Sequence, residues 1–208
     1  MREFIIGINE AGQRLDKYLK KILPNASSGF LYKMLRKKNI TCNKAKMTGK
    51  EQLKKGDRIQ IFFSEETFMK FMQDPEKLKN EFEQLKTLPL KGLRVVYEDE
   101  DILIADKPYN MLSQKAKDHD ISANEYLLGY LIRSGSLELE GFASFRPSVC
   151  NRLDRNTTGL LLMGKSLNGS QTLSQALKDR TIRKFYRALV SGEIKESAHL
   201  SGYLRKDE

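Results

Sequence analysis

The chain has 208 residues, and its composition, 39% hydrophobic and 31% charged, is typical of a globular protein with one or two domains. Its 37 Lys and Arg residues exceed its 27 Asp and Glu residues, so the net charge of +10 favours a polyanionic partner such as nucleic acid. The sequence has neither a signal-peptide pattern nor an apolar run of roughly 18 residues, which excludes a membrane-spanning protein and predicts a cytoplasmic one.

The potential metal ligands and thiols are scattered. Cys42 and Cys150 are isolated, and His119 and His199 lack metal-ligand spacing, so we predict neither a disulfide framework nor a metal site. The acidic run at 98–101 lacks the spaced ligands and the Gly of a calcium loop, and it is predicted to be a solvated hairpin turn.

The first elements in chain order are a strand and two helices. Residues 1–8 alternate loosely in apolar character, which predicts a strand, and 13–23 carry an apolar face at helical spacing. Ser27 or Ser28 can cap a second helix. Cations crowd the end of that helix beyond what its macrodipole favours, and these are Lys33, Arg36, Lys37 and Lys38.

Strands and a turn follow these helices, and then a change of composition. Residues 40–43 and 58–63 predict strands, and 54–57 predicts a turn. Residues 64–90 are rich in Glu, Lys, Met and Phe, and we interpret them as a linker. Within it, Asp74 and Pro75 mark the start of a helix whose packing partner the sequence does not identify.

The rest of the chain combines short strands with helices. The predicted strands are 94–97, 102–105, 159–164 (expected to be buried) and 185–190, and the predicted helices are 122–132 and one capped by Ser166. Because strands and helices do not alternate regularly, we predict an α+β fold with a mixed, mainly antiparallel sheet and flanking helices.

One polar turn has the residues of a reactive site. In Asn151-Arg-Leu-Asp-Arg-Asn-Thr-Thr-Gly159, the carboxylate of Asp154 stands between Arg152 and Arg155. Neighbouring positive charges favour an ionised carboxylate and suit a polyanionic substrate. The alternative is a purely structural ion pair in a turn before a strand.

The longer run from Asn151 to Met163 closely resembles the signature of RluA-type pseudouridine synthases. Two further matches fall in the order of that family, Tyr97-Glu-Asp-Glu-Asp-Ile-Leu-Ile-Ala-Asp-Lys-Pro108 and Lys184-Phe-Tyr-Arg-Ala-Leu-Val-Ser-Gly192. The resemblance implies an isomerase of uridine in RNA that needs no cofactor. It also implies Asp154 as catalytic carboxylate, Tyr186 as catalytic pocket tyrosine, and Arg152 and, more weakly, Arg155 as substrate-binding residues.

The amino-terminal elements resemble the small RNA-binding domain named after ribosomal protein S-four, whose paired helices grip RNA. The resemblance makes the basic residues candidate phosphate contacts, and they are Arg14, Lys33, Arg36, Lys37 and Lys38. The alternative is a solvated basic face. We therefore predict an RNA-binding domain at 1–63, a linker at 64–90, and part of a synthase domain at 91–208.

The chain departs from the family pattern in three respects. Asn151 replaces the usual His, Asn110 stands near the place of a usual Gly, where it can still adopt a left-handed conformation, and the sequence lacks the family's later strands. We expect a monomer that acts on ribosomal RNA, with little activity unless another chain supplies those strands. The alternatives are a non-catalytic RNA-binding protein, that is, a truncated synthase, and a transfer-RNA pseudouridine synthase.

Overall fold

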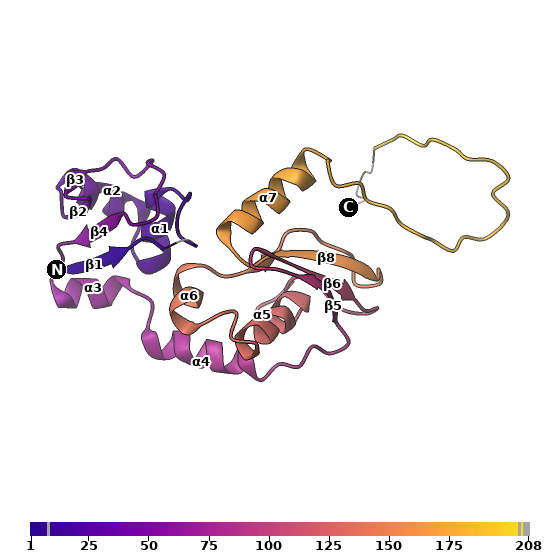
Figure 1. The fold of residues 1–208 in the computed structure, drawn as a ribbon, viewed down its shortest axis with the longest axis horizontal. Coiled ribbons are helices and arrows are strands. Elements are labelled where there is room, and N and C mark those ends of the chain that lie inside the picture. The colour runs from indigo at the N-terminus through magenta and orange to yellow at the C-terminus, as the bar shows by residue number, and fades with distance from the viewer. Residues whose placement is uncertain (8, 204, 206–208) are drawn as a thin grey trace.

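The computed structural model describes residues 1–7, 9–203 and 205, and it contains two four-stranded sheets (Figure 1). Every pair of named strands is antiparallel. Each sheet packs on its own hydrophobic core. The model is thus a mixed α and β structure with antiparallel sheets, as expected. No helix within the described ranges is long and apolar enough to cross a membrane.

The amino-terminal sheet has the order β1-β4-β2-β3 and packs on two helices. Its elements are β1 (Arg2–Ile5), α1 (Leu15–Ile22), α2 (Ser28–Arg36), β2 (Ile40–Cys42), β3 (Ala45–Lys46) and β4 (Arg58–Ile61). Ser27 caps α2, since its side chain accepts a hydrogen bond from the Phe30 amide at 3.2 Å. The predicted helices and strands are therefore present, although Ile8, in the predicted first strand, lies outside the described residues.

The segment after β4 forms two helices, of which the sequence predicted only the second. They are α3 (Glu65–Phe71) and α4 (Pro75–Lys86), and Asp74 caps α4. Phe68 of α3 is buried in the amino-terminal core, whereas Phe82 of α4 is buried in the second core. The linker thus belongs to both cores.

The second sheet has the order β5-β6-β8-β7. Its elements are β5 (Arg94–Glu98), β6 (Ile102–Lys107), α5 (Ala123–Arg133), α6 (Leu139–Ser144), β7 (Ser148–Val149), β8 (Gly159–Gly164) and α7 (Leu167–Lys178). The sequence patterns predicted no helix at the position of the short α6. In β8, Leu161 and Met163 are buried but Leu160 is 53% exposed, so the prediction of a fully buried strand is wrong for one face.

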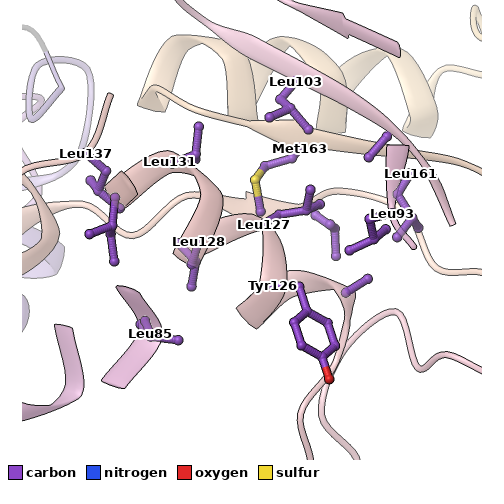
Figure 2. Close-up of a cluster of buried hydrophobic side chains, with 14 of the residues drawn as sticks. Leu85, Leu93, Leu103, Tyr126, Leu127, Leu128, Leu131, Leu137, Leu161 and Met163 are labelled. Carbon is purple, nitrogen blue, oxygen red and sulfur yellow. The ribbon is translucent and has the colours of Figure 1, made fainter. Parts of the chain in front are cut away.

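Helix α5 lies at the centre of the second core, between the sheet and α4 (Figure 2). Leu127 and Leu131 pack with Leu103 of β6, and Leu85 comes from α4. A Cβ atom on Gly129 would lie only 2.3 Å from the carbonyl oxygen of Leu85. The contact between these helices therefore depends on the absence of a side chain at Gly129.

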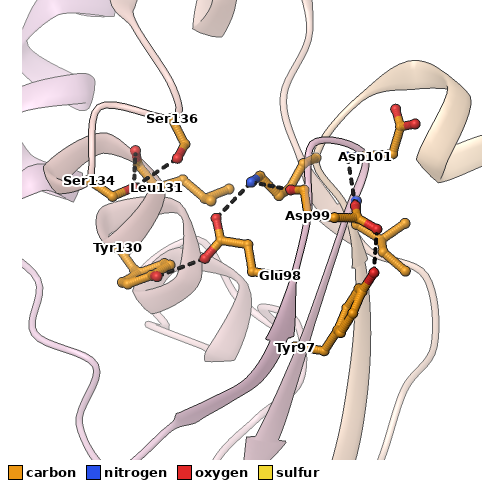
Figure 3. A network of polar contacts seen from close by, with 10 residues as sticks. Tyr97, Glu98, Asp99, Asp101, Tyr130, Leu131, Ser134 and Ser136 are labelled. Atoms are coloured by element: carbon orange, nitrogen blue, oxygen red, sulfur yellow. Dashed lines mark hydrogen bonds and ion pairs between the residues drawn. The ribbon is translucent and has the colours of Figure 1, made fainter.

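Asp99 and Glu100 of the acidic turn between β5 and β6 are exposed, as predicted, whereas Glu98, the last residue of β5, makes tertiary contacts that the sequence did not indicate. Glu98 is half-buried; its Oε1 accepts a hydrogen bond from Lys165 Nζ at 2.6 Å, and its Oε2 accepts one from the Tyr130 hydroxyl at 2.7 Å. Tyr97 donates to Asp99 at 2.8 Å (Figure 3). These contacts tie the hairpin to α5 and to the end of β8.

Within the described residues, 182–203 form no helix or strand, and they trace a wide loop beyond α7 (Figure 1). The strand predicted at 185–190 is therefore wrong. Strands need a neighbour for their backbone hydrogen bonds, and this segment pairs with no strand in the described part of the chain. Tyr186 is 67% exposed, which agrees with a segment outside the core.

Candidate active site

The turn between β7 and β8 places Asp154 at an exposed tip. The Thr157 amide donates to the Asp154 carbonyl at 3.0 Å, which closes the tip. Gly159 then begins β8 with a φ of +128°, a backbone conformation that side chains disfavour. The sequence Asp-Arg-Asn-Thr-Thr-Gly therefore folds into a tight turn with its carboxylate in solvent.

Asn151 closes the base of this turn. Its side-chain amide donates to the Leu160 carbonyl at 3.0 Å, and its side-chain oxygen accepts from the Leu162 amide at 2.8 Å. The side chain thus makes the two hydrogen bonds that a neighbouring strand would make. The departure from His at this position leaves the turn intact.

Ser113 supports the turn from the loop before α5. Its hydroxyl donates to the Leu153 carbonyl at 2.6 Å, and its oxygen accepts from the Leu153 amide at 2.9 Å. The Ser122 hydroxyl in turn donates to the Ser113 carbonyl at 3.3 Å. Both backbone polar groups of Leu153, the residue immediately before Asp154, are therefore hydrogen-bonded to Ser113.

Lys107, at the end of β6, lies beneath the turn. Its side chain is fully buried, and Nζ donates to the carbonyl oxygens of Met111 (2.8 Å), Pro108 (3.1 Å) and Arg155 (3.3 Å). Burial lowers the pKa of Lys107, and the negative charge of Asp154 partly opposes that shift. An ammonium group thus fixes the backbone next to Asp154 and attracts its carboxylate.

The sequence did not indicate this role for Lys107, because a lysine usually stays in solvent. Conversely, the predicted arrangement of Arg152 and Arg155 around Asp154 is not found. Both guanidinium groups are exposed, and within the described ranges neither forms an ion pair with Asp154. Lys107 is a cation near the turn that sequence reasoning missed, and its pKa responds to the negative charge of Asp154.

Tyr186 and the turn line a common hollow of about 530 Å³, which we call the Tyr186 hollow. The turn supplies Leu153 and Thr157, β8 supplies Leu160, and the coil supplies Tyr186. Asp154 does not line this hollow, and Arg152 lies outside it as well. The structure thus brings Tyr186 to the turn but not into contact with the carboxylate.

The predicted phosphate contacts of the amino-terminal part fall into two groups. Those at the end of α2 are exposed, and they are Lys33, Arg36, Lys37 and Lys38. Arg14 is engaged instead: its Nη2 lies 2.6 Å from Asp16, which also accepts a hydrogen bond from the Tyr32 hydroxyl at 2.8 Å. The end of α2 is therefore an open cationic surface.

The described residues include no cluster of three His, Cys, Asp or Glu side chains that could hold a metal ion. What the site offers is an exposed carboxylate on a fixed turn, a buried ammonium beneath it and an aromatic hollow beside it. A sequence model of RNA pseudouridylate synthase matches residues 101–208, which include the turn and Tyr186. The chain belongs to the RNA pseudouridylate synthase family.

Curated relatives agree with this assignment. The chain is 27% identical over 206 residues to an uncharacterized RNA pseudouridine synthase of Mycoplasma genitalium, covering 99% of this chain and 61% of that protein. It is 30% identical over 207 residues to ribosomal large subunit pseudouridine synthase C of Rickettsia felis, covering 98% and 64%. The protein of that name in Vibrio parahaemolyticus is 29% identical over 189 residues, covering 90% and 54%. The chain thus spans about three fifths of the length of the relatives it matches.

The hydrogen bonds of Lys107 predict an effect on the stability of this protein. Lys107→Met keeps much of the side-chain length but removes the ammonium, so the carbonyls of Pro108, Met111 and Arg155 lose a donor. We expect the free energy of unfolding to fall by about 2 kcal/mol, since buried polar groups left unpaired cost about 1–3 kcal/mol. Chemical denaturation measures this effect. Lys178→Met, at an exposed position of α7, is the control, and equal stabilities of the two variants would contradict the prediction.

Proposed function

We propose that this chain converts uridine to pseudouridine in structured RNA, with large-subunit ribosomal RNA as its substrate. The observation that carries the proposal is the exposed Asp154 carboxylate on a turn fixed by Asn151, Ser113 and Lys107. A catalytic group held in place by its neighbours needs little reorganisation when substrate arrives. The names of the Rickettsia and Vibrio relatives support ribosomal RNA as substrate.

The chemistry requires the target base to leave its stack, because its glycosidic bond is out of reach within a helix. Flipping a nucleotide costs a few kcal/mol of lost stacking. Asp154 then acts on the ribose, either as a nucleophile at the sugar or as a base that removes a ribose proton. The detached uracil turns and rejoins the sugar through carbon 5. Atoms and charge balance without an external reagent, since the reaction is an isomerisation.

Other residues of the site have supporting roles in this proposal. Tyr186 lines the hollow beside the turn, where its ring can stack on the flipped base and its hydroxyl can assist proton transfer at carbon 5. Arg152, exposed two residues before Asp154, is suited to enter the space that the base vacates. Arg155 is suited to a phosphate contact. Tyr186, Arg152 and Arg155 are all exposed, so RNA can reach the aromatic ring and the two cations.

We further propose that residues 1–63 form an RNA-binding domain similar to that of ribosomal protein S-four. The exposed cations at the end of α2 support this proposal, whereas Arg14 contributes less because Asp16 already pairs with it. Residues 64–90 link this domain to the synthase part. The basic surface supplies general affinity for RNA, and the Asp154 turn supplies the chemistry.

The activity is tested by following tritium release from carbon 5 of labelled uridine in ribosomal and transfer RNA. The assay uses the 208-residue chain and, in parallel, the chain extended to the length of its relatives by any further coding sequence. Release from ribosomal RNA supports the proposal. Release from transfer RNA alone would assign transfer RNA as the substrate instead. If both the 208-residue chain and the extended chain bound RNA without tritium release, the non-catalytic alternative would be favoured.

The basic surface of α2 predicts a change in salt dependence. Replacing Lys33, Arg36 and Lys37 together with Ala should weaken binding to RNA of any sequence. The slope of log affinity against log salt should become shallower by about 2–3 units, because each phosphate contact contributes about 0.7–0.9. Fluorescence anisotropy at several salt concentrations measures the slope. Triple replacement of the exposed Lys77, Lys79 and Lys86 in α4 is the control, and an unchanged slope in the α2 variant would reject the assignment.

A further inference from the structure

A second hollow, of about 420 Å³, also borders the Asp154 turn but shares no lining residue with the Tyr186 hollow, and we call it the Tyr109 hollow. The turn supplies Arg155 to this hollow, whereas it supplies Asn156, Thr157 and Thr158 to the Tyr186 hollow. The candidate catalytic turn therefore contributes consecutive residues to two separate hollows. A volume of this size falls in the range of small-ligand sites, about 300–1,000 Å³.

The rim of the Tyr109 hollow combines an aromatic ring with cations. Tyr109 is 66% exposed, and Lys91 and Arg155 contribute an ammonium and a guanidinium group. Lys91 Nζ lies 5.7 Å from the ring centre of Tyr126, which forms a buried wall. Aromatic rings and cations are the groups that bind bases and phosphates of unpaired RNA.

One carboxylate also lines the hollow, but its hydrogen bonds are largely made within its own loop. Asp120 Oδ2 accepts from the amides of Lys117 at 2.8 Å and Ala116 at 3.1 Å. The first of these hydrogen bonds is the main reason that the pKa of Asp120 is lowered. With two cations against this one engaged anion, the hollow favours a ligand that carries negative charge.

Tyr109 is exposed because its turn holds it there. Asn110 has the left-handed φ of +61° that the sequence predicted, and the carbonyls on either side, of Pro108 and Met111, both accept from the buried Lys107. An aromatic ring that is 66% exposed gains little from the core. Because the backbone that carries the ring is fixed, fewer degrees of freedom are lost when a base stacks on it.

We propose that the Tyr109 hollow binds the nucleotide next to the target uridine, with its base stacked on Tyr109 and its phosphate between Lys91 and Arg155. This inference rests on the proposed function, since it places RNA across the Asp154 turn. The flipped uridine then occupies the Tyr186 side, and its neighbour is held on the Tyr109 side. Splaying the two nucleotides apart in this way keeps the target base out of its stack.

The test compares two fluorescein-labelled probes of equal length, a decamer of uridines and the same sugar-phosphate strand without bases. We expect Tyr109→Ala to weaken binding of the uridine decamer about tenfold, because stacking on an aromatic side chain contributes about 1–3 kcal/mol per base. Binding of the strand without bases should not change. Tyr109→Phe should retain most of the affinity, because it keeps the ring.

Lys91→Ala should weaken binding of both probes and make the slope of log affinity against log salt shallower by about one unit. The control is Tyr97→Ala, which removes a tyrosine of comparable exposure, 49%, from the β5 edge away from the hollow. Equal loss with both probes for Tyr109→Ala, or no loss with either, overturns the inference. Binding of poly-glutamate in preference to RNA, abolished by Lys91→Ala, would instead assign the hollow to an acidic peptide.

These outcomes are independent of catalysis. Tyr109→Ala can lose affinity whether or not Asp154 proves to be the catalytic group, and the reverse also holds. As a direct check, a decamer carrying 4-thiouridine should crosslink under ultraviolet light to the peptide that contains Tyr109. Crosslinking confined to the amino-terminal domain contradicts the inference.

Discussion

Asp154→Asn should abolish pseudouridine formation while leaving the fold and the affinity for RNA almost unchanged. The amide has nearly the size of the carboxylate, and the hydrogen bonds that hold the turn come from the Asp154 backbone and from Asn151, Ser113 and Lys107, not from the carboxylate. The neutral amide is neither an effective nucleophile nor a base. The barrier should therefore return close to its unassisted height, and turnover should fall by many orders of magnitude.

The measurement is tritium release from carbon 5 of labelled uridine, alongside binding of the same RNA, in the form of the protein that shows activity. Asp118→Asn is the matched control, because it removes one exposed carboxylate outside the residues that line either hollow. If Asp154→Asn bound RNA normally and kept more than about a tenth of wild-type turnover, a barrier change of only about 1.4 kcal/mol, Asp154 would not be the catalytic group.

The sequence predicted those parts of the fold that local patterns control. Ser27, Asp74 and Ser166 cap helices as expected, because capping involves only nearby backbone amides. The left-handed Asn110 is likewise a local property. The β5–β6 hairpin was also recognised, since two short apolar runs around a polar turn indicate neighbouring strands.

Features that depend on distant partners were not predicted. A strand at 185–190 needs an adjacent strand, and its alternating side chains cannot indicate whether one exists. Lys107 looked like an ordinary surface lysine, yet residues 48 positions apart in the chain, Lys107 and Arg155, meet in the fold. For the same reason a cation that interacts with the proposed catalytic carboxylate was sought among its chain neighbours, whereas Lys107 lies on another strand.

The packing partner of α4, the linker helix, was likewise not predicted from the sequence. The contact between α4 and α5 gives the largest expected change in stability. Gly129→Ala should destabilise the second core by about 3 kcal/mol, at the upper end of the usual cost of overpacking. Helix propensity alone predicts the opposite, because Ala is favoured over Gly by about 1 kcal/mol in a helix. We expect the steric contact to outweigh the helix propensity. The new Cβ would lie 2.3 Å from the Leu85 carbonyl oxygen and 3.2 Å from that of Leu88, and these packed backbone atoms cannot easily move away.

The melting temperature should then fall by roughly 6–12 °C for a chain of this size. Gly29→Ala is the control, since Gly29 lies in α2 with no atom within 4 Å of the new Cβ. This variant gains the helix propensity without the clash, so its melting temperature should stay the same or rise slightly. Because α4 packs on α5 around this close approach, Gly129→Ala should also speed hydrogen exchange of the α4 amides. A Gly129→Ala variant as stable as Gly29→Ala would show that α4 does not pack tightly on α5 in solution.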